Sequence, residues 1–322
     1  MSRHLVVRSL RRIGRVLPLG VRRRLRPLAR STGLGLPTDK WWVERGEGSV
    51  GRLNTGGPRR CNICGWSGAA FVGIAHVESA LCPVCESSAR DRFLLWCAAR
   101  APSTGARRAR VLETSPRMGD DYRSMMRRHY DYQASDYDLG AHRADIQIDL
   151  QAMALPDASI DVLLTPHVLE HVPNTAAAMA EIHRVLAPSG RMYLQVPLVR
   201  GTTVAPSTPE FHADNTLVCW NFGWDLTAML CTAGFTTTVL VTADFARLLG
   251  GDGEVPAPNG DVFDVADIVR GARPDDLTVV ASAAEAQAMG WLPPYQFATW
   301  ECIRDRRVVE RPVSRTASKS NG

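Results

Sequence analysis

The sequence contains no apolar run that approaches the roughly 18 residues of a membrane-spanning helix. Its first residues lack the apolar centre and the small-residue cleavage site of a signal peptide, so we expect a cytoplasmic protein. Eight cysteines in 322 residues, without an export signal, exclude a small secreted domain held by disulfides. A hydrophobic share of 45% and a charged share of 22% are ordinary for a globular protein and exclude collagen and a coiled coil.

Acidic residues are absent from residues 1–38, which hold ten arginines. The formal net charge of +5 therefore conceals an acidic body, because the rest of the chain has 28 basic and 33 acidic residues. Arginines and apolar residues form two faces of a predicted helix between Arg3 and Leu17, which Pro18 interrupts. This pattern is typical of helices on an anionic membrane surface or on nucleic acid, with a solvated extension as the alternative. We expect residues 1–30 to contact the inner membrane face peripherally, with nucleic acid as the less favoured partner.

Two Cys-x-x-Cys pairs lie 17 residues apart, and together they offer four thiolates. Four thiolates at this spacing form the closed tetrahedral shell that structural Zn²⁺ accepts, with two disulfides as the alternative. The predicted zinc ligands are Cys61, Cys64, Cys82 and Cys85. Ser87 or Ser88 is the expected N-cap of a helix that follows and runs to Arg100.

Strand and helix patterns alternate from about residue 107, which indicates a mostly parallel sheet covered on both faces. The predicted strands cover Arg110–Glu113, Tyr132–Asp136, Ile146–Asp149, Ile160–Thr165, Arg191–Val196, Thr236–Val241 and Phe297–Ile303. The predicted helices run from Asp120 to Arg128, from the N-cap Asn174 to the stop signal Pro188–Gly190, and from Trp224 to Gly234. Ligands of such sheets bind beyond the carboxyl ends of the strands, so the residues there matter most.

The domain boundaries predicted from these patterns divide the chain into four parts. These are a basic extension and linker (1–55), a four-cysteine zinc ribbon with its helix (56–100), an α/β domain (101–310) and a disordered tail (311–322). An insertion at 244–295 interrupts the α/β domain before its last strand. It either covers the site where a substrate binds or decorates the surface.

Three acidic residues, Glu113, Asp136 and Asp149, fall at successive predicted strand ends. They suit a ligand with an amine, a ribose diol and an exocyclic adenine amine, and S-adenosylmethionine has all three. The segments Leu155–Val172 (LPDASIDVLLTPHVLEHV) and His183–Gly190 (HRVLAPSG) resemble class I S-adenosylmethionine-dependent methyltransferases of the type 11 branch. This resemblance extends over about residues 107–243.

The resemblance implies a fold and an activity. The fold is α/β, with a Rossmann-like, seven-stranded methyltransferase sheet whose last strand is antiparallel, and a small N-terminal zinc ribbon. The four cysteines followed by Arg90–Leu95 (RDRFLL) resemble a subgroup often encoded beside glycosyltransferases. The implied activity is methyl transfer from S-adenosylmethionine to an oxygen or nitrogen of a small molecule or saccharide intermediate.

The family's motifs also imply which residues bind the cofactor. Glu113 matches the first-strand acid near the methionine amino group, and Asp136 matches the acid that holds the ribose hydroxyls. Asp149 and Leu150 match the pair beside the adenine. The remaining implied cofactor residues are Thr114, Ser115 and Gly119 in the first loop, and Thr165, Pro166 and His167 on the methyl side.

The first loop departs from the family, which usually has Gly-x-Gly after the first-strand acid. Here the loop reads Thr114-Ser-Pro-Arg-Met-Gly119, where side chains restrict the approach of the backbone to the cofactor. A catalytically silent binding or scaffold protein is therefore one alternative. An RNA methyltransferase is another, because some of those also combine four cysteines with this fold. The acidic body and the Thr165-Pro-His sequence disfavour RNA.

Three histidines are candidates for the general base that accepts the proton of a hydroxyl acceptor: His171, His167 and His212. Each has a structural hydrogen-bonding role as its alternative. His167, Glu170 and His171 also match the inverted zincin pattern HxxEH, but Pro173 prevents a long ligand helix, which disfavours a peptidase. A weak divalent-ion site at this turn is an alternative. The oligomeric state is not determined by the sequence.

Overall fold

The computed structural model describes residues 58–71, 81–101, 107–142, 144–198, 200–212, 216–252, 265–291 and 298–305. The basic segment 1–30, the linker that follows it and the predicted tail 311–322 lie outside the described residues. Within the described ranges, no helix has the length and apolar character needed to cross a bilayer.

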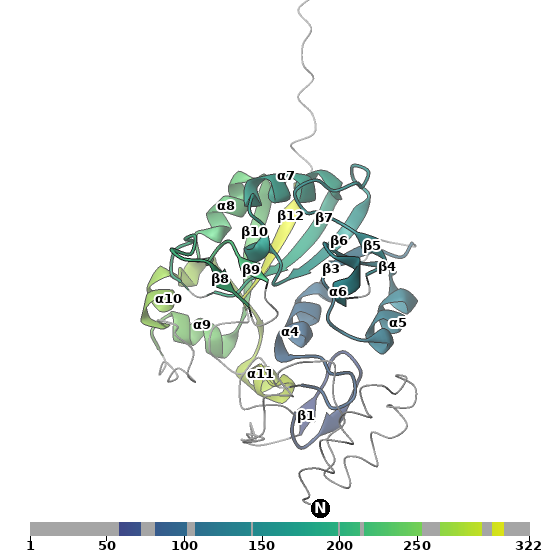
Figure 1. The fold of residues 1–322 in the computed structure, drawn as a ribbon. Helices are drawn as coiled ribbons and strands as arrows, with labels where there is room; N and C mark the ends of the chain where they lie inside the picture. Colours follow the sequence, from purple (N-terminus) through teal and green to yellow (C-terminus); the bar gives the residue numbers. More distant parts are fainter. Residues whose placement is uncertain are drawn as a thin grey trace, which may run out of the picture.

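An eight-stranded sheet forms the centre of the domain, with the strand order β11-β10-β12-β7-β6-β3-β4-β5 (Figure 1). The strands are β3 (Arg110–Thr114), β4 (Asp131–Asp136), β5 (Ile146–Gln147), β6 (Ile160–Pro166), β7 (Leu186–Gln195), β10 (Phe235–Thr242), β11 (Leu277–Ala281) and β12 (Thr299–Arg304). β12 is antiparallel to β10 and β7, and the other neighbouring pairs are parallel. Seven of these strands form the predicted sheet with its antiparallel last strand, and β11 is an additional edge strand.

Helices cover both faces of the sheet, as Figure 1 shows. Successive residues of β3 point to opposite faces, so Val111 packs with α4 and α5 whereas Leu112 packs with α7 and α8. The helices are α4 (Ala89–Ala98), α5 (Asp120–His129), α6 (Leu139–His142), α7 (Thr175–Val185), α8 (Leu226–Thr232), α9 (Ala243–Leu249), α10 (Val265–Gly271) and α11 (Ala283–Met289), with short 3₁₀ turns η2 (Leu169–His171) and η3 (Pro274–Asp276). This is the helix-covered α/β architecture that the alternation predicts.

Local sequence accounts for the ends of the main helices. The side chain of Asn174 accepts a hydrogen bond from Ala177 N at 3.0 Å, as predicted for the N-cap of α7. Ser88 forms a capping box with Asp91 at the start of α4. β7 starts at Leu186, five residues before its predicted start. The pairing of β7 with β6 shifts register between Leu186 and Arg191. Glycine is needed at Gly190 in this irregular stretch, because an added Cβ would lie 2.7 Å from the carbonyl oxygen of Ala187.

The predicted insertion contains structure that the sequence patterns did not indicate. β11 extends the sheet by pairing in parallel with β10, and α11 contacts the four-cysteine module. Arg59 Nη1 donates to the carbonyl oxygen of Gln287 at 2.5 Å and Arg92 Nε donates to that of Met289 at 3.0 Å. The described part of the insertion therefore joins the sheet to this module. Its predicted role as a cover of the acceptor site stays a prediction.

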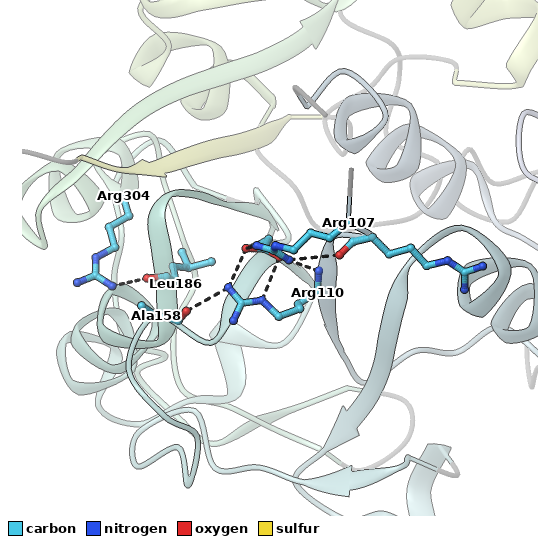
Figure 2. A network of polar contacts seen from close by, with 7 residues as sticks. Arg107, Arg110, Ala158, Leu186 and Arg304 are labelled. Carbon is cyan, nitrogen blue, oxygen red and sulfur yellow. Dashed lines mark hydrogen bonds and ion pairs between the residues drawn. The ribbon is translucent and has the colours of Figure 1, made fainter. Parts of the chain in front are cut away.

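Two arginines converge on Asp161 at the amino end of β6, away from the strand ends that form the candidate site. Arg107 donates through Nη1 and Nη2 at 2.6 and 2.7 Å. Arg110 donates through its backbone N at 2.8 Å and Nη2 at 2.9 Å, and its guanidinium also reaches the carbonyl oxygen of Ala158 (Figure 2). Burial alone raises the pKa of Asp161, but these donors outweigh it and hold the pKa well below its usual range.

We expect Asp161→Asn to lower the free energy of unfolding by about 2 kcal/mol at pH 7, because it leaves two arginines facing a neutral group. Partial exposure of both arginines keeps the loss below that of a fully buried pair. Because the pKa of Asp161 is depressed in the folded state, its carboxylate stabilises the folded protein at pH values above the unfolded-state pKa of about 3.9. The difference in unfolding free energy between the parent and Asp161→Asn should therefore shrink as the pH falls below about 3.9. Urea denaturation at several pH values measures this. Asp157→Asn, at an exposed ion pair, is the control and should change stability by less than about 0.5 kcal/mol.

Candidate functional site

The carboxyl ends of β3, β4 and β6 lie at one edge of the sheet because these strands are parallel neighbours. Two residues directly beyond these ends have left-handed backbones, Ser115 with φ +47° and His167 with φ +52°. Non-glycine residues rarely adopt this conformation, and such strain concentrates at functional sites. In the loop where the resembled family has glycine, Ser115 thus adopts a backbone conformation that glycine favours.

Glu113 is buried beneath this edge and is 2% exposed. Its Oε2 accepts hydrogen bonds from the hydroxyls of Tyr122 at 2.9 Å and Tyr132 at 2.7 Å. Burial raises the pKa of Glu113 to about 7, although the two tyrosines act in the opposite direction. The sequence patterns did not single out either tyrosine. The carboxylate of Glu113 therefore already has two hydrogen-bond partners. Its predicted contact with the methionine amino group stays a prediction.

The raised pKa of Glu113 makes stability depend on pH. A carboxyl group with a raised folded-state pKa stabilises below its unfolded value, and this contribution is lost as the pH rises through about 7. Relative to the parent, Glu113→Gln should therefore gain up to about 3 kcal/mol in unfolding free energy between pH 5 and pH 8. Urea denaturation across this range measures the trend. Asp131→Asn, which changes an exposed carboxyl at the start of β4, is the matched control.

Asp136 ends β4 and is 7% exposed. Its Oδ2 lies 2.7 Å from His142 Nδ1, and its Oδ1 accepts a hydrogen bond from the backbone N of Asp138 at 3.1 Å. Burial alone raises the pKa of Asp136, but the His142 and Asp138 contacts outweigh it and lower the pKa. Asp136 is therefore held as a carboxylate at the strand end. Its two oxygens have lone pairs for further hydroxyl donors.

Other predicted cofactor residues line the same edge. Asp149 follows β5 and accepts a hydrogen bond from Gln151 N at 2.9 Å, while Leu150 is buried in the core beside it. Thr114 is buried at the end of β3, and its hydroxyl reaches the carbonyl oxygen of Leu164 at 3.5 Å. Gly119 is the N-cap of α5, and a Cβ added there would meet no atom within 4 Å. The first loop is thus open at Gly119.

Three buried polar atoms at the ends of β6 and β7 have no hydrogen-bond partner among the described residues. They are Thr165 Oγ1, His167 Nε2 and Gln195 Oε1. The backbone N of His167 donates to the carbonyl oxygen of Gln195 at 2.8 Å, so these two strand ends lie together. Pro166, between Thr165 and His167, is half-buried. Buried polar groups are normally paired, so this group of atoms indicates a place for a polar ligand.

His171 and His212 come together although they are 41 residues apart in sequence. Their rings make an edge-to-face contact with centroids 4.7 Å apart. His171 belongs to η2, and His212 follows strand β8 (Glu210–Phe211) in a hairpin with β9 (Leu217–Val218). Burial lowers the pKa of His167 well below its ordinary value, so that its imidazole is neutral at physiological pH. All three predicted general-base candidates are thus near one turn.

The four predicted zinc ligands form a second candidate site, outside the sheet. Their sulfur atoms all lie within 4.8 Å of one another, with 3.6 Å between Cys61 and Cys85 and 3.5 Å between Cys64 and Cys82. A tetrahedral zinc site with Zn–S bonds of 2.3 Å separates its sulfurs by about 3.8 Å. Disulfide sulfurs are about 2.05 Å apart, and all four cysteines are free. The geometry fits a metal and contradicts the disulfide alternative.

The two cysteine pairs have the same backbone geometry. In each pair, the residue four positions after the first cysteine donates its N–H to the carbonyl of that cysteine and has a positive φ, as Gly65 and Glu86 show. Arg92 of α4 is fully buried and attaches this module to the domain. Its Nη1 donates to the carbonyl oxygen of Ser87 at 2.6 Å, and its guanidinium lies 3.9 Å from the ring centroid of Phe71.

Comparisons with known proteins agree on the central domain. Residues 109–194, from the start of β3 into β7, match the family model of a methyltransferase domain. A 102-residue region is 32% identical to a probable S-adenosylmethionine-dependent methyltransferase of Mycobacterium tuberculosis, over 30% of this chain and 34% of that protein. Residues 109–194, at the centre of the described sheet, are therefore similar to methyltransferase domains.

Two further proteins resemble this chain, one over a short region only and the other with a low TM-score. A 49-residue region is 45% identical to an uncharacterised 37.1 kDa protein in transposon Tn4556 of Streptomyces fradiae, over 15% of this chain and 14% of that protein. A methyltransferase crystal structure from Mesorhizobium loti aligns with a TM-score of 0.38 and 18% identity, over 66% of this chain and 98% of that chain. The chain thus spans about a third or less of the curated relatives that it matches.

Proposed function

We propose that this protein transfers a methyl group from S-adenosylmethionine to an oxygen or nitrogen of a small molecule or saccharide intermediate. One observation supports this most directly. The region that matches a methyltransferase domain is also the region whose strand ends gather a buried carboxylate and two left-handed residues. The same strand ends hold buried polar atoms that have no hydrogen-bond partner within the described part of the chain. The carboxylate and the other oxygen acceptors suit a nucleoside that presents hydroxyl and amine groups.

In this proposal, residues at different strand ends bind different parts of the cofactor. Asp136 accepts hydrogen bonds from the ribose hydroxyls, for which a buried carboxylate is a strong acceptor. Asp149 and Leu150 border the adenine. Asp149 accepts a hydrogen bond from its exocyclic amine, and Leu150 packs against the face of its ring. Thr165 and His167 border the methyl end, where their buried polar atoms need partners. Bound there, S-adenosylmethionine supplies an electrophilic methyl group on a sulfonium.

The residues of this chain contribute mainly by position, because methyl transfer from a sulfonium depends on alignment of the acceptor atom. A hydroxyl acceptor also needs a group that accepts its proton. His167 is buried beside the proposed methyl end, and its Nε2 can form a hydrogen bond with a hydroxyl acceptor there. The hairpin that bears His212 exposes the aromatic ring of Phe211 and the side chain of Leu217, which suit a sugar ring or another apolar acceptor surface.

Calorimetry with S-adenosylmethionine and with its demethylated product tests this proposal. We expect both to bind the purified full-length protein. Absence of binding would overturn the methyltransferase proposal and favour a catalytically silent scaffold. Binding of the cofactor together with methylation of RNA, but not of small acceptors, would favour the RNA enzyme instead.

The four-cysteine module supports a second part of the proposal, one structural zinc ion. The four sulfurs form a closed ligand shell with no position left for a substrate. When bound, the zinc would hold the two cysteine pairs together beneath α4 and α11. Its role here is folding, and no step of methyl transfer involves it.

The arginines of residues 1–30 are proposed to bring the protein to the inner, anionic membrane face, beside lipid-linked saccharide intermediates. Each basic residue near such a surface contributes about 1 kcal/mol. Vesicle sedimentation of the full chain and of a chain beginning near Ser31 should show salt-sensitive binding by the full chain alone. RNA gel shifts on the same two proteins are the comparison. RNA binding lost on truncation, without vesicle binding, would contradict the membrane interpretation.

A further inference from the structure

A group of three possible metal ligands lies at the η2 turn, apart from the four cysteines. The carboxylate of Glu170 and the imidazoles of His171 and His212 each offer one ligand atom, and these three atoms all lie within 4.8 Å of one another. Glu170 is 1% exposed, whereas both histidines are half-buried. The group is thus buried on one side and accessible on the other, as expected for an ion that enters from solvent.

The hydrogen bond made by His171 determines which of its ring nitrogens can bind a cation. Its Nδ1 lies 2.6 Å from the carbonyl oxygen of Leu217. A carbonyl only accepts hydrogen bonds, so the hydrogen is on Nδ1, and Nε2 of the neutral ring presents a lone pair. Histidine ligands of metals normally donate their second ring N–H to a carbonyl or carboxylate in this way.

The Nε2 atom of His171 lies 3.8 Å from Oε1 of Glu170. This distance is well beyond the 2.7–2.9 Å of a charge-assisted hydrogen bond, so no direct bond joins the two atoms. In the neutral ring both atoms carry lone pairs, so one cation between them can accept an electron pair from each. Tetrahedral ligands at 2.0–2.2 Å are about 3.4 Å apart, so this pair needs to close by only a few tenths of an ångström.

The third ligand comes from the β8–β9 hairpin, which is attached to the η2 turn by backbone contacts. Cys219 N and Trp220 N both donate to the carbonyl oxygen of Glu170, at 2.8 and 3.1 Å. His212 N donates to the carbonyl oxygen of Thr216 at 2.9 Å and closes the loop of the hairpin. The hairpin therefore places the ring of His212 at the η2 turn, with its ligand atom within 4.8 Å of those of Glu170 and His171.

We infer that Glu170, His171 and His212 form a binding site for one divalent transition-metal ion. Two imidazole nitrogens and one carboxylate oxygen favour Zn²⁺, Co²⁺ or Ni²⁺ over Mg²⁺ and Ca²⁺, which prefer all-oxygen shells. Three protein ligands leave at least one position open to water or to an oxygen of another molecule, unlike the closed four-sulfur shell. This inference goes beyond the proposed methyl transfer and does not depend on it.

The ligand set differs from the HxxEH pattern of the sequence. That pattern predicts a helix with His167 and His171 as ligands, but η2 is a three-residue 3₁₀ turn and His167 precedes it with a left-handed backbone. His167 Nδ1 lies 3.7 Å from Glu170 Oε1, yet His167 does not belong to the group whose atoms lie within 4.8 Å. The third ligand is instead the distant His212, so a helix-borne zincin site is excluded.

Equilibrium dialysis of the full-length protein against Co²⁺ tests the site, with zinc in the four-cysteine module measured before and after. The parent should bind one Co²⁺ per chain in addition to the retained zinc, with the weak absorption of a nitrogen and oxygen site rather than the intense bands of cobalt thiolates. His212→Ala and Glu170→Gln should weaken this binding by at least tenfold. His212→Asp should restore part of it, because aspartate is also a ligand.

Two variants serve as controls and should bind Co²⁺ as the parent does. His167→Asn suits the left-handed backbone and tests the HxxEH set, and His129→Ala removes an unrelated exposed histidine. No cobalt beyond the zinc-holding module, or equal binding by the parent and His212→Ala, would overturn the inference. Loss in His167→Asn with retention in His212→Ala would also overturn it. Glu170 is buried, and its variant can misfold. His212 follows β8 at the surface, so His212→Ala tests the site independently of the Glu170 variant.

Discussion

Full-length protein dialysed against a mild chelator should retain one zinc ion per chain, and Cys82→Ser should lose it. The sulfurs of the four cysteines already lie at nearly tetrahedral separations, so the site needs little rearrangement to bind zinc. Apparent binding free energies of structural zinc in small modules are about 10 kcal/mol or more, and this energy is folding energy. Elemental analysis of the parent and the variant measures the outcome.

Loss of this zinc should also destabilise the sheet domain. Arg92 contacts the module through Ser87 and Phe71, and contacts α11 through Met289, so an unfolded module leaves a buried guanidinium without these partners. We expect Cys82→Ser to lower the melting temperature and to expose the module to limited proteolysis. Cys231→Ser, at an exposed cysteine outside the cluster, should change neither property. Zinc-free, reductively purified parent protein, or disulfides among the four cysteines, would disprove the assignment.

Asp136→Ala should weaken S-adenosylmethionine binding by at least tenfold. A hydrogen bond to a charged group contributes about 1.5–3 kcal/mol, and a ribose diol can donate two to this carboxylate. Asp136 is suited to this role because it is 7% exposed and is held as a carboxylate by His142 and Asp138. Calorimetric titration of the parent and the variant with S-adenosylmethionine measures the effect.

The control for this titration lies on the same strand. Asp131→Asn changes a carboxylate at the opposite, exposed end of β4, and it should bind the cofactor as the parent does. Equal affinity of Asp136→Ala and the parent would mean that Asp136 does not hold the ribose. Equal losses in both variants would point to a general effect of charge on binding. Denaturation curves of both variants exclude unfolding as the cause.

Local patterns in the sequence were sufficient for the elements of the sheet. Alternating apolar runs identified seven of its strands, because the side chains of a strand must match two packed faces. Asn174 and Ser88 identified two helix starts, since a cap acts on backbone N–H groups only two or three residues away. The spacing of the four cysteines identified their cluster for a similar reason, because each pair forms its own tight turn.

The sequence by itself therefore determined the fold class, the strand ends at which the candidate site lies and the four-sulfur cluster. Only the tertiary structure decided that Tyr122 and Tyr132 bind Glu113, that His142 contacts Asp136, and that β11 joins the sheet. It also decided that His212, rather than His167, completes the group with Glu170 and His171. Sequence periodicity predicts which face of a strand or helix a residue occupies. The partners named above come from separate elements, and which of them meet depends on how the whole domain packs.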